Sequence, residues 1–292
     1  MALTPLQRYH RAAARSAAVV IGEYSTSFGL AVRLLPRETR VHIRDVYALV
    51  RLADEVVDGV AAASGLLPDE IAAALDALEA ETYAAMATGY STNLVVHAFA
   101  RTARRVGIER QIVTPFFTSM RMDLTRAEHT DASFAEYVDG SAEVVGLMCL
   151  RAFTAAGPVR TPEQLAVLEQ GARRLGAAFQ KVNFLRDLAA DADGLGRAYF
   201  PDVEVSRIDE STKHRLLADI DADLVAAART LPLLERGPRR AVALAHGLFA
   251  ELADRIRATP AEDLRTTRIR VPDPVKLQLA ALAVADRLPR RR

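Results

Sequence analysis

The sequence predicts an all-α fold. Alanine, leucine and arginine dominate the composition, and runs in which β-branched and polar residues alternate with a period of two are nearly absent. Apolar residues recur instead at three- and four-residue steps, between breaks marked by glycine and proline. Half of the 292 residues are hydrophobic, and no low-complexity linker or abrupt change in composition divides them. We therefore predict a single helical domain that spans residues 1–292.

The composition also narrows the class of protein. The formal net charge is +1, so no global field favours a nucleic acid as partner. Cys149 is the only cysteine, which excludes an intramolecular disulfide and fits the reducing cytoplasm. No signal peptide opens the sequence, and its longest apolar run, 277–285, is far short of the ~20 residues that cross a bilayer. We expect a soluble cytoplasmic protein.

The expected helices follow from the breaks. Residues 5–34 form one or two helices, because small and polar residues interrupt the pattern at 22–29. Pro36 ends that section, and Ser91 is expected to cap a helix that starts at residue 92. The remaining helices are expected at residues 38–60, 69–88, 92–106, 108–124, 134–153, 162 to about 191, 209–233, 238–258 and 275–288.

Two rows of oxygen-bearing side chains suggest a chemistry. Asn183, Asp187 and Asp191 fall four residues apart, so on a helix they lie on one face, and Asp54 and Asp58 repeat the spacing upstream. A single pair at this spacing is common on solvated helices. Here the neighbouring positions are largely apolar, and carboxylates in apolar helices cost free energy unless they are paired or bind a metal. Facing oxygen ligands suit Mg²⁺.

Arg51 lies on the stripe that carries Asp54 and Asp58, together with Tyr47. Two interpretations stay open for this stripe. Arg51 and Asp54 make an intrahelical salt bridge, or the arginine holds an anion while the acids hold a cation. On the downstream helix Gln180 extends the polar row by about one turn.

Several stretches resemble the motifs of the squalene/phytoene synthase family. YALVRLADEVVDG (47–59) is similar to the first aspartate-rich motif of that family, and QKVNFLRDLAADADGLGRAYFP (180–201) is similar to the second. STSFGLAVRLLP (25–36) resembles the N-terminal serine-phenylalanine motif, and YVDGSAEVVGLM (137–148) occupies the place of the YxxxxAGxVG helix. RIRVPDPVKL (268–277) is a weaker match.

The resemblance implies an all-α isoprenoid synthase fold around a central cavity, in which two prenyl diphosphates are joined head to head. It implies catalytic roles for Arg51, Asp54, Asp58 and Asp187. The implied Mg²⁺ ligands, for which Mn²⁺ is a substitute, are Asp54, Asp58, Asn183, Asp187 and Asp191. The implied contacts to the substrate are made by Ser25, Ser27, Tyr47, Arg51, Gln180 and Arg268.

This chemistry has physical requirements that the sequence meets. Ionising an allylic diphosphate requires that charge on the leaving group be neutralised, and the resulting carbocation requires an apolar, water-poor cavity. A bundle rich in alanine and leucine provides such a cavity. The GLGRAYFP segment, with Arg197 and Tyr199, is either a lid over the diphosphates or a plain surface connection.

Three positions depart from the family pattern. Asp139 stands where bacterial members often have tyrosine, Glu143 where the family has glycine, and Phe249 where a C-terminal tyrosine is common. The tyrosine hydroxyls are associated with guiding the cation, so these changes leave the metal chemistry intact and place the expected product in question.

The leading hypothesis is an Mg²⁺-dependent prenyltransferase that makes phytoene from two geranylgeranyl diphosphates by way of a cyclopropylcarbinyl diphosphate, without NADPH. The alternatives are squalene or dehydrosqualene synthesis from farnesyl diphosphate, a terpene cyclase, and a non-enzymatic assembly factor. No GxGxxG loop is present to bind NADPH, although relatives that form squalene bind it without one. Peripheral membrane contact through Arg287 and the terminal Arg290–Arg292 is a further hypothesis.

Overall fold

The computed structural model describes residues 3–188 and 197–286. It confirms the all-α prediction: helices follow one another throughout this part of the chain, which contains no named β-strand and a single isolated bridge between Glu128 and Ala198. None of its helices is long and apolar enough to cross a membrane. Asp191 and the arginines at 287 and 290–292 lie outside the described residues.

Residues 5–33 form two helices, which is one of the two arrangements that the sequence predicted. α1 (Pro5–Tyr24) and α2 (Thr26–Arg33) meet at Ser25, which has an extended backbone, and the Ser25 Oγ accepts a hydrogen bond from the Phe28 amide. α3 (Arg37–Val57) begins directly after Pro36 and ends three residues before the predicted position. It stops there because Gly59 has a φ of +105°, in the left-handed region that favours glycine.

α4 (Val60–Ala63), α5 (Pro68–Thr88), α6 (Leu94–Val106) and α7 (Arg110–Thr125) follow. The prediction that Ser91 caps α6 is wrong. The cap is Asn93, whose side chain accepts hydrogen bonds from the amides of Val95 and Val96, whereas the Ser91 hydroxyl donates to Glu81 at 2.6 Å. Serine and asparagine are both good N-caps, so the spacing alone did not separate them.

The stretch of small residues after position 138 brings helices close together. α8 (Asp131–Val138) continues into a π-helical turn, η1 (Asp139–Glu143), and then into α9 (Val144–Thr154). A Cβ atom at Gly140 would collide with the carbonyl of Pro115 on α7, and one at Gly146 with the carbonyl of Ala172 on the next helix. The glycines are therefore required by the packing.

α10 (Pro162–Arg186) ends earlier than predicted, because Asp187 is its C-cap with φ −101° and ψ 10°. The chain continues through η3 (Val205–Arg207), α12 (Glu210–Thr230), η4 (Leu231–Leu233), α13 (Arg236–Ala258), η5 (Ala261–Arg265) and α14 (Asp273–Val284). α13 begins before the predicted residue 238. Pro238 fits its first turn, where the amide that proline lacks would have no helical partner.

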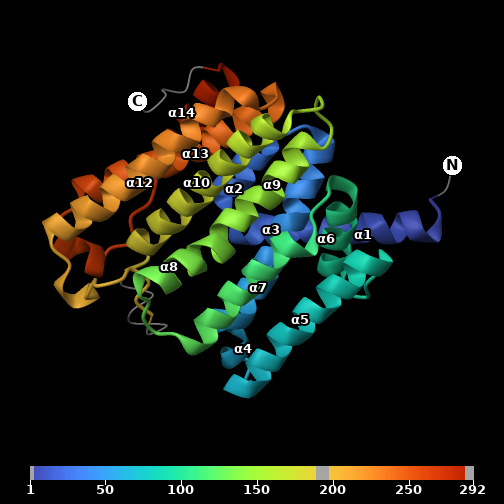
Figure 1. Cartoon of the computed structure of the whole chain (residues 1–292), viewed down its shortest axis with the longest axis horizontal. Helices are drawn as coiled ribbons and strands as arrows, with labels where there is room; N and C mark the ends of the chain where they lie inside the picture. The colour runs from blue at the N-terminus through green and yellow to red at the C-terminus, as the bar shows by residue number, and fades with distance from the viewer. Residues whose placement is uncertain (1–2, 189–196, 287–292) are drawn as a thin grey trace.

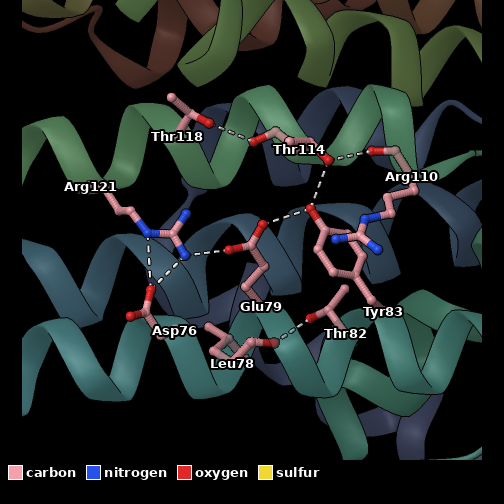
Figure 2. A network of polar contacts seen from close by, with 9 residues as sticks. All are labelled: Asp76, Leu78, Glu79, Thr82, Tyr83, Arg110, Thr114, Thr118 and Arg121. Atoms are coloured by element: carbon pink, nitrogen blue, oxygen red, sulfur yellow. Dashed lines mark hydrogen bonds and ion pairs between the residues drawn. The ribbon is translucent and has the colours of Figure 1, made fainter.

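α10 runs through the middle of the bundle, with α12 and α13 on one side and α9 on the other (Figure 1). α5 and α7 form the opposite edge, where Arg121 on α7 is held by Asp76 and Glu79 on α5 (Figure 2). The Tyr83 hydroxyl donates to Glu79 at 2.7 Å in the same network. This network ties α5 to α7 at the edge of the bundle. The cavity of the protein lies among the more central helices.

Candidate active site

A cavity of about 1000 Å³ lies among α2, α3, η1, α9, α10, α13 and the segment that leads into α14. This volume is at the upper end of the ~300–1000 Å³ that is usual for ligand pockets. The cavity wall contains every predicted site residue that the structure describes: Ser25, Ser27, Tyr47, Arg51, Asp54, Asp58, Gln180, Asn183, Asp187 and Arg268. Segments more than 200 residues apart in the sequence thus meet at one site.

Asp54 is the most perturbed acid of the first row. Burial, and then the nearby carboxylate of Asp58, raise the pKa of Asp54 to about 8. Arg51 forms its close ion pair with Glu55 and lies 4.0 Å from an Asp54 oxygen, so the Arg51–Asp54 salt bridge is only a marginal contact. The Arg51 guanidinium also lies 4.5 Å from the centre of the Tyr24 ring. In the part of the chain that the structure describes, Asp54 has no ion pair closer than this 4.0 Å contact.

Asp58 is the C-cap of α3, and Arg197 holds it in place. The Arg197 guanidinium donates to Asp58 Oδ1 at 3.0 Å and to the carbonyl oxygen of Val57 at 2.7 Å. Arg197 is itself buried, which excludes a plain surface connection at this residue. The segment that follows the second acidic row is therefore tied to the end of the first.

The sequence analysis missed Asp123, a buried acid on α7 that also lines the cavity. Its carboxylate accepts hydrogen bonds from the hydroxyls of Tyr137 at 2.9 Å and Tyr199 at 3.1 Å, and Arg197 lies 3.5 Å away. Burial raises the pKa of Asp123 to about 6, although Arg197 opposes this shift. The available signal was helical spacing, because Asp123 falls three residues after Met120 and seven after Phe116, on the apolar face of the predicted helix.

In the second acidic row, Asn183 lies within α10 and Asp187 is the C-cap of that helix. Asn183, on α10, has a buried side-chain oxygen with no hydrogen-bond partner among residues 3–188 and 197–286. Asp187 lies just past the helix end, where it pairs with Arg186 and with Arg268 Nε at 2.7 Å. The Asp187 amide still donates to the Asn183 carbonyl oxygen at 2.9 Å, so Asp187 follows Asn183 by one turn as the spacing predicted, and both residues line the cavity. Arg186, Arg270 and Lys276 also line this end of the cavity, and the sequence analysis did not select them.

Away from the acids the wall is apolar and aromatic. Phe179 on α10 and Phe249 on α13 stack with ring centres 3.8 Å apart, and Phe28 packs beside both. Phe249 thus contributes a ring face where the family pattern has a hydroxyl. Asp139 and Glu143 do not line the cavity; both pair with Arg173 on α10. The differences from the family pattern at Asp139 and Glu143 therefore do not alter the side chains that line the cavity.

The donor set fits a hard divalent cation in its chemistry. The acidic end offers carboxylate and amide oxygens, which Mg²⁺ and Mn²⁺ accept, and the orphaned oxygen of Asn183 lacks a partner that such an ion supplies. Within residues 3–188 and 197–286, no three acidic, histidine or cysteine side chains are grouped so that they could hold a metal as they stand. Arginines engage Asp58 and Asp187 instead.

The fold has counterparts of known structure. A dehydrosqualene synthase in complex with a ligand aligns with a TM-score of 0.78 at 22% identity, covering 97% of this chain and 99% of that one. A squalene synthase from Alicyclobacillus acidocaldarius aligns with a TM-score of 0.73 at 21% identity, covering 87% and 96%. The bundle around the cavity is therefore the all-α isoprenoid synthase fold.

The sequence comparisons define the family. The squalene/phytoene synthase family model matches residues 21–274. A phytoene synthase of Mycobacterium tuberculosis is 29% identical over 281 residues, which covers 89% of this chain and 86% of that protein. The chain belongs to the squalene/phytoene synthase family, and it is an enzyme of the prenyltransferase class.

Proposed function

We propose that this enzyme condenses two geranylgeranyl diphosphates head to head into phytoene, by way of a cyclopropylcarbinyl diphosphate, in an Mg²⁺-dependent reaction. The observation that carries the proposal is the division of one cavity into an end with acids and arginines and a long apolar remainder. A prenyl diphosphate is divided in the same way, into a charged diphosphate and a long apolar chain. The mycobacterial relative, which matches over most of both chains, is named phytoene synthase.

The acidic end would hold the metal. Asp54, Asp58, Asn183 and Asp187 are the proposed ligands, and Asp191, outside the described residues, is the proposed fifth. Mg²⁺ held there, or Mn²⁺ in its place, would neutralise charge that develops on the departing diphosphate. The raised pKa of Asp54 supports this assignment, because a carboxyl group that crowds against Asp58 gains most from a nearby cation.

Arg51 and Arg268 bind and orient the diphosphates, with the hydroxyls of Ser25 and Ser27 and the side chains of Tyr47 and Gln180 beside them. A guanidinium presents two N–H groups in the geometry of two phosphate oxygens, so it fixes the direction of the leaving group. Both arginines pair with carboxylates in the ligand-free protein. Each is therefore held at the site before the anion arrives.

The apolar wall protects the carbocation. Phe28, Phe179 and Phe249 exclude water from the region beyond the acids, and their ring faces carry negative charge density that stabilises a nearby cation. Tyr137 and Tyr199 bring hydroxyls to the cavity, where both donate to Asp123. We infer that these two hydroxyls take the place of the tyrosines that the family pattern has at positions 139 and 249.

A product assay tests the proposal. The enzyme is incubated with C15 or C20 prenyl diphosphate, with and without Mg²⁺ and NADPH, and diphosphate and hydrocarbons are measured. We expect Mg²⁺-dependent release of diphosphate and a linear C40 hydrocarbon without NADPH. A C30 product would assign squalene synthesis if it requires NADPH and dehydrosqualene synthesis if it does not. A cyclic product would assign a cyclase. No release of diphosphate from either substrate would contradict the enzyme proposal.

A further inference from the structure

The first helix rests on the bundle largely through small side chains. Residues 3–8 are all exposed, and Figure 1 shows the start of α1 extending beyond the other helices. The next turns bury Ala13 and Ala17 in a cluster with alanines of α3 and α6. An alanine side chain buries little apolar area, so this packing stabilises the docked helix only weakly. The polar and aromatic contacts of α1 therefore decide how firmly it is held.

Two histidines form a contact of this kind. The ring of His10 on α1 stacks on the ring of His97 on α6, with centres 5.2 Å apart and an interplanar angle of 29°. Beside them the Tyr9 hydroxyl donates to the carbonyl oxygen of Ser91 at 2.8 Å, and the Tyr9 ring meets His97 edge-on at 4.8 Å. We call Tyr9, His10, Ser91 and His97 the α1 latch.

The hydrogen bonding of His97 favours its neutral form. The Ser91 amide donates to Nδ1 of His97 at 3.4 Å, so the neutral ring carries its proton on Nε2. His97 is fully buried, and Nε2 has no hydrogen-bond partner among residues 3–188 and 197–286. A second proton would have to go on Nδ1, where it would point at the Ser91 N–H. Protonation therefore breaks a contact of the turn whose carbonyl oxygen anchors Tyr9.

The charges around the latch also oppose protonation. Burial and then Arg101 lower the pKa of His10, and burial, His10 and Arg101 lower the pKa of His97. In the described part of the chain neither ring pairs with a carboxylate, because the nearby Glu81 instead accepts a hydrogen bond from the Ser91 hydroxyl at 2.6 Å. Both pKa values lie below the ordinary 6.5. Docking of α1 therefore loses stability as the pH falls below 6.5, because the detached helix binds these protons more tightly.

The helix α3, which completes this seam, contributes two more titrating groups. The Thr102 hydroxyl donates its one proton to Asp45 Oδ2 at 2.7 Å, so it accepts a hydrogen bond from His42 Nδ1 at 2.9 Å. Burial lowers the pKa of His42 and raises that of Asp45. Asp45 therefore acts in the opposite sense to the histidines, since its effect makes the fold more stable as the pH falls. The charged groups that act on His42 are Glu38, Arg101 and Arg105.

We propose that the α1 latch is an acid-sensitive switch, in which protonation of His10 and His97 releases α1 from the bundle and opens the acidic end of the cavity. The same helix carries Ile21 and Tyr24, which line the cavity, and the Tyr24 ring lies 4.5 Å from the Arg51 guanidinium. Release of α1 takes this ring away from Arg51. The release itself is independent of the proposed function, and its effect on substrate binding rests on that function.

Hydrogen exchange of the whole enzyme, measured by mass spectrometry, tests the switch. Exchange of residues 5–17 is compared about one pH unit above and about one pH unit below the ordinary histidine pKa, after correction for intrinsic rates. We expect the protection of α1 to fall by about tenfold or more on acidification, because one unit of pKa shift changes an equilibrium tenfold. The other helices should keep their protection, since Asp45 by itself stabilises the fold in acid.

Two variants remove the titrating groups and a third is the control. His10→Phe keeps a ring for stacking, and His97→Asn keeps an oxygen that accepts from the Ser91 amide. Each should reduce the acid-induced loss of α1 protection to less than about threefold, because only one of the two protons can then be added. His214→Asn changes an exposed histidine on the distant α12 and should behave as the unmodified enzyme does. His10 is only half-buried, so His10→Phe alone decides the matter if His97→Asn does not fold.

An equal loss of α1 protection in His10→Phe and the unmodified enzyme would overturn the proposal. A protection that does not change with pH, or a loss spread over all helices, would overturn it as well. Diphosphate release gives the second readout: the KM for the C20 diphosphate should rise on acidification, and it should rise less in His10→Phe. An equal rise in both would overturn the link between the latch and the cavity. If no diphosphate is released at any pH, the proposed function fails, and hydrogen exchange still decides the switch.

Discussion

The two ends of the cavity are built on different principles. At the acidic end, carboxylates and arginines from α3, α7 and α10 are held by directional contacts, such as those of Arg197 with Asp58 and Val57. Elsewhere in the cavity wall the buried side chains of Leu150, Leu168 and Leu234, which we call the leucine floor, pack together as an apolar cluster. Replacing one group of a directional site removes a contact that the chemistry needs, whereas a change in an apolar cluster lowers mainly the stability of the fold. The largest effects on catalysis are therefore expected at the acidic end.

Removing a carboxylate should have the largest effect. We expect Asp54→Ala and Asp187→Ala each to lower kcat by a factor of about 100 or more, because each removes a proposed metal ligand from the site of charge development. Asp139→Ala is the matched control, since Asp139 pairs with Arg173 outside the cavity. Near-normal turnover in the Asp54 or Asp187 variant, with helical content confirmed by circular dichroism, would refute the metal assignment.

Arg51→Lys should have the next largest effect. Lysine keeps the charge but cannot present two fixed N–H groups to a diphosphate, so we expect roughly a tenfold loss in kcat/KM. The same exchange at Arg121, in the structural network of Figure 2, is the control and should leave kcat/KM unchanged. Equal activity of Arg51→Lys and the unmodified enzyme would remove Arg51 from the diphosphate site.

Asp123→Asn tests whether metal binding at the acidic end depends on Asp123, which contacts Arg197. The change weakens the acceptor for Tyr137 and Tyr199 and removes the charge near Arg197, so the Arg197–Asp58 contact should loosen. We expect a several-fold rise in the Mg²⁺ concentration for half-maximal activity, with a loss of roughly 1–3 kcal/mol in the free energy of unfolding. A loss of stability with an unchanged Mg²⁺ requirement would show that Asp123 only supports the fold.

A change at the floor should affect packing more than chemistry. Leu168→Ala removes a buried side chain from the leucine floor, and we expect it to lower the free energy of unfolding by about 2–4 kcal/mol. The Mg²⁺ requirement should stay the same, and the rate of diphosphate release should change by less than about threefold. A loss of activity as large as that of Asp54→Ala would contradict the contrast between the two ends.

The smallest effect on catalysis is expected at Asp45. This buried acid on α3 accepts a hydrogen bond from Thr102 at 2.7 Å. Burial raises its pKa from 3.8 to about 7. The folded protein therefore holds this proton more tightly than the unfolded chain, and stability falls as the pH rises through this interval. Asp45→Asn should flatten that fall in urea denaturation without changing kcat. An unchanged pH profile would contradict the assignment.

The same comparison explains which features the sequence could predict. Asp54 and Asp58 are separated by one turn of one helix, so their spacing alone placed them on a common face. Asp187 follows Asn183 by one turn in the same way, but the end of α10 at Arg186 and the pairing of Asp187 with the distant Arg268 could not be read from that spacing. Asp123 and the leucine floor were missed for a related reason: each depends on partners from other helices, such as Tyr199 for the acid and Leu234 for the floor.

The central claim is that one cavity holds diphosphates at its acidic end and prenyl chains toward the leucine floor. A crystal structure with Mn²⁺ and a thiodiphosphate analogue of the C20 substrate tests this claim most directly. We expect anomalous density for Mn²⁺ between Asp54 and Asp187, with the prenyl chain running past Phe179 toward Leu168. Manganese bound away from these acids, or a chain that lies outside the cavity, would contradict the account.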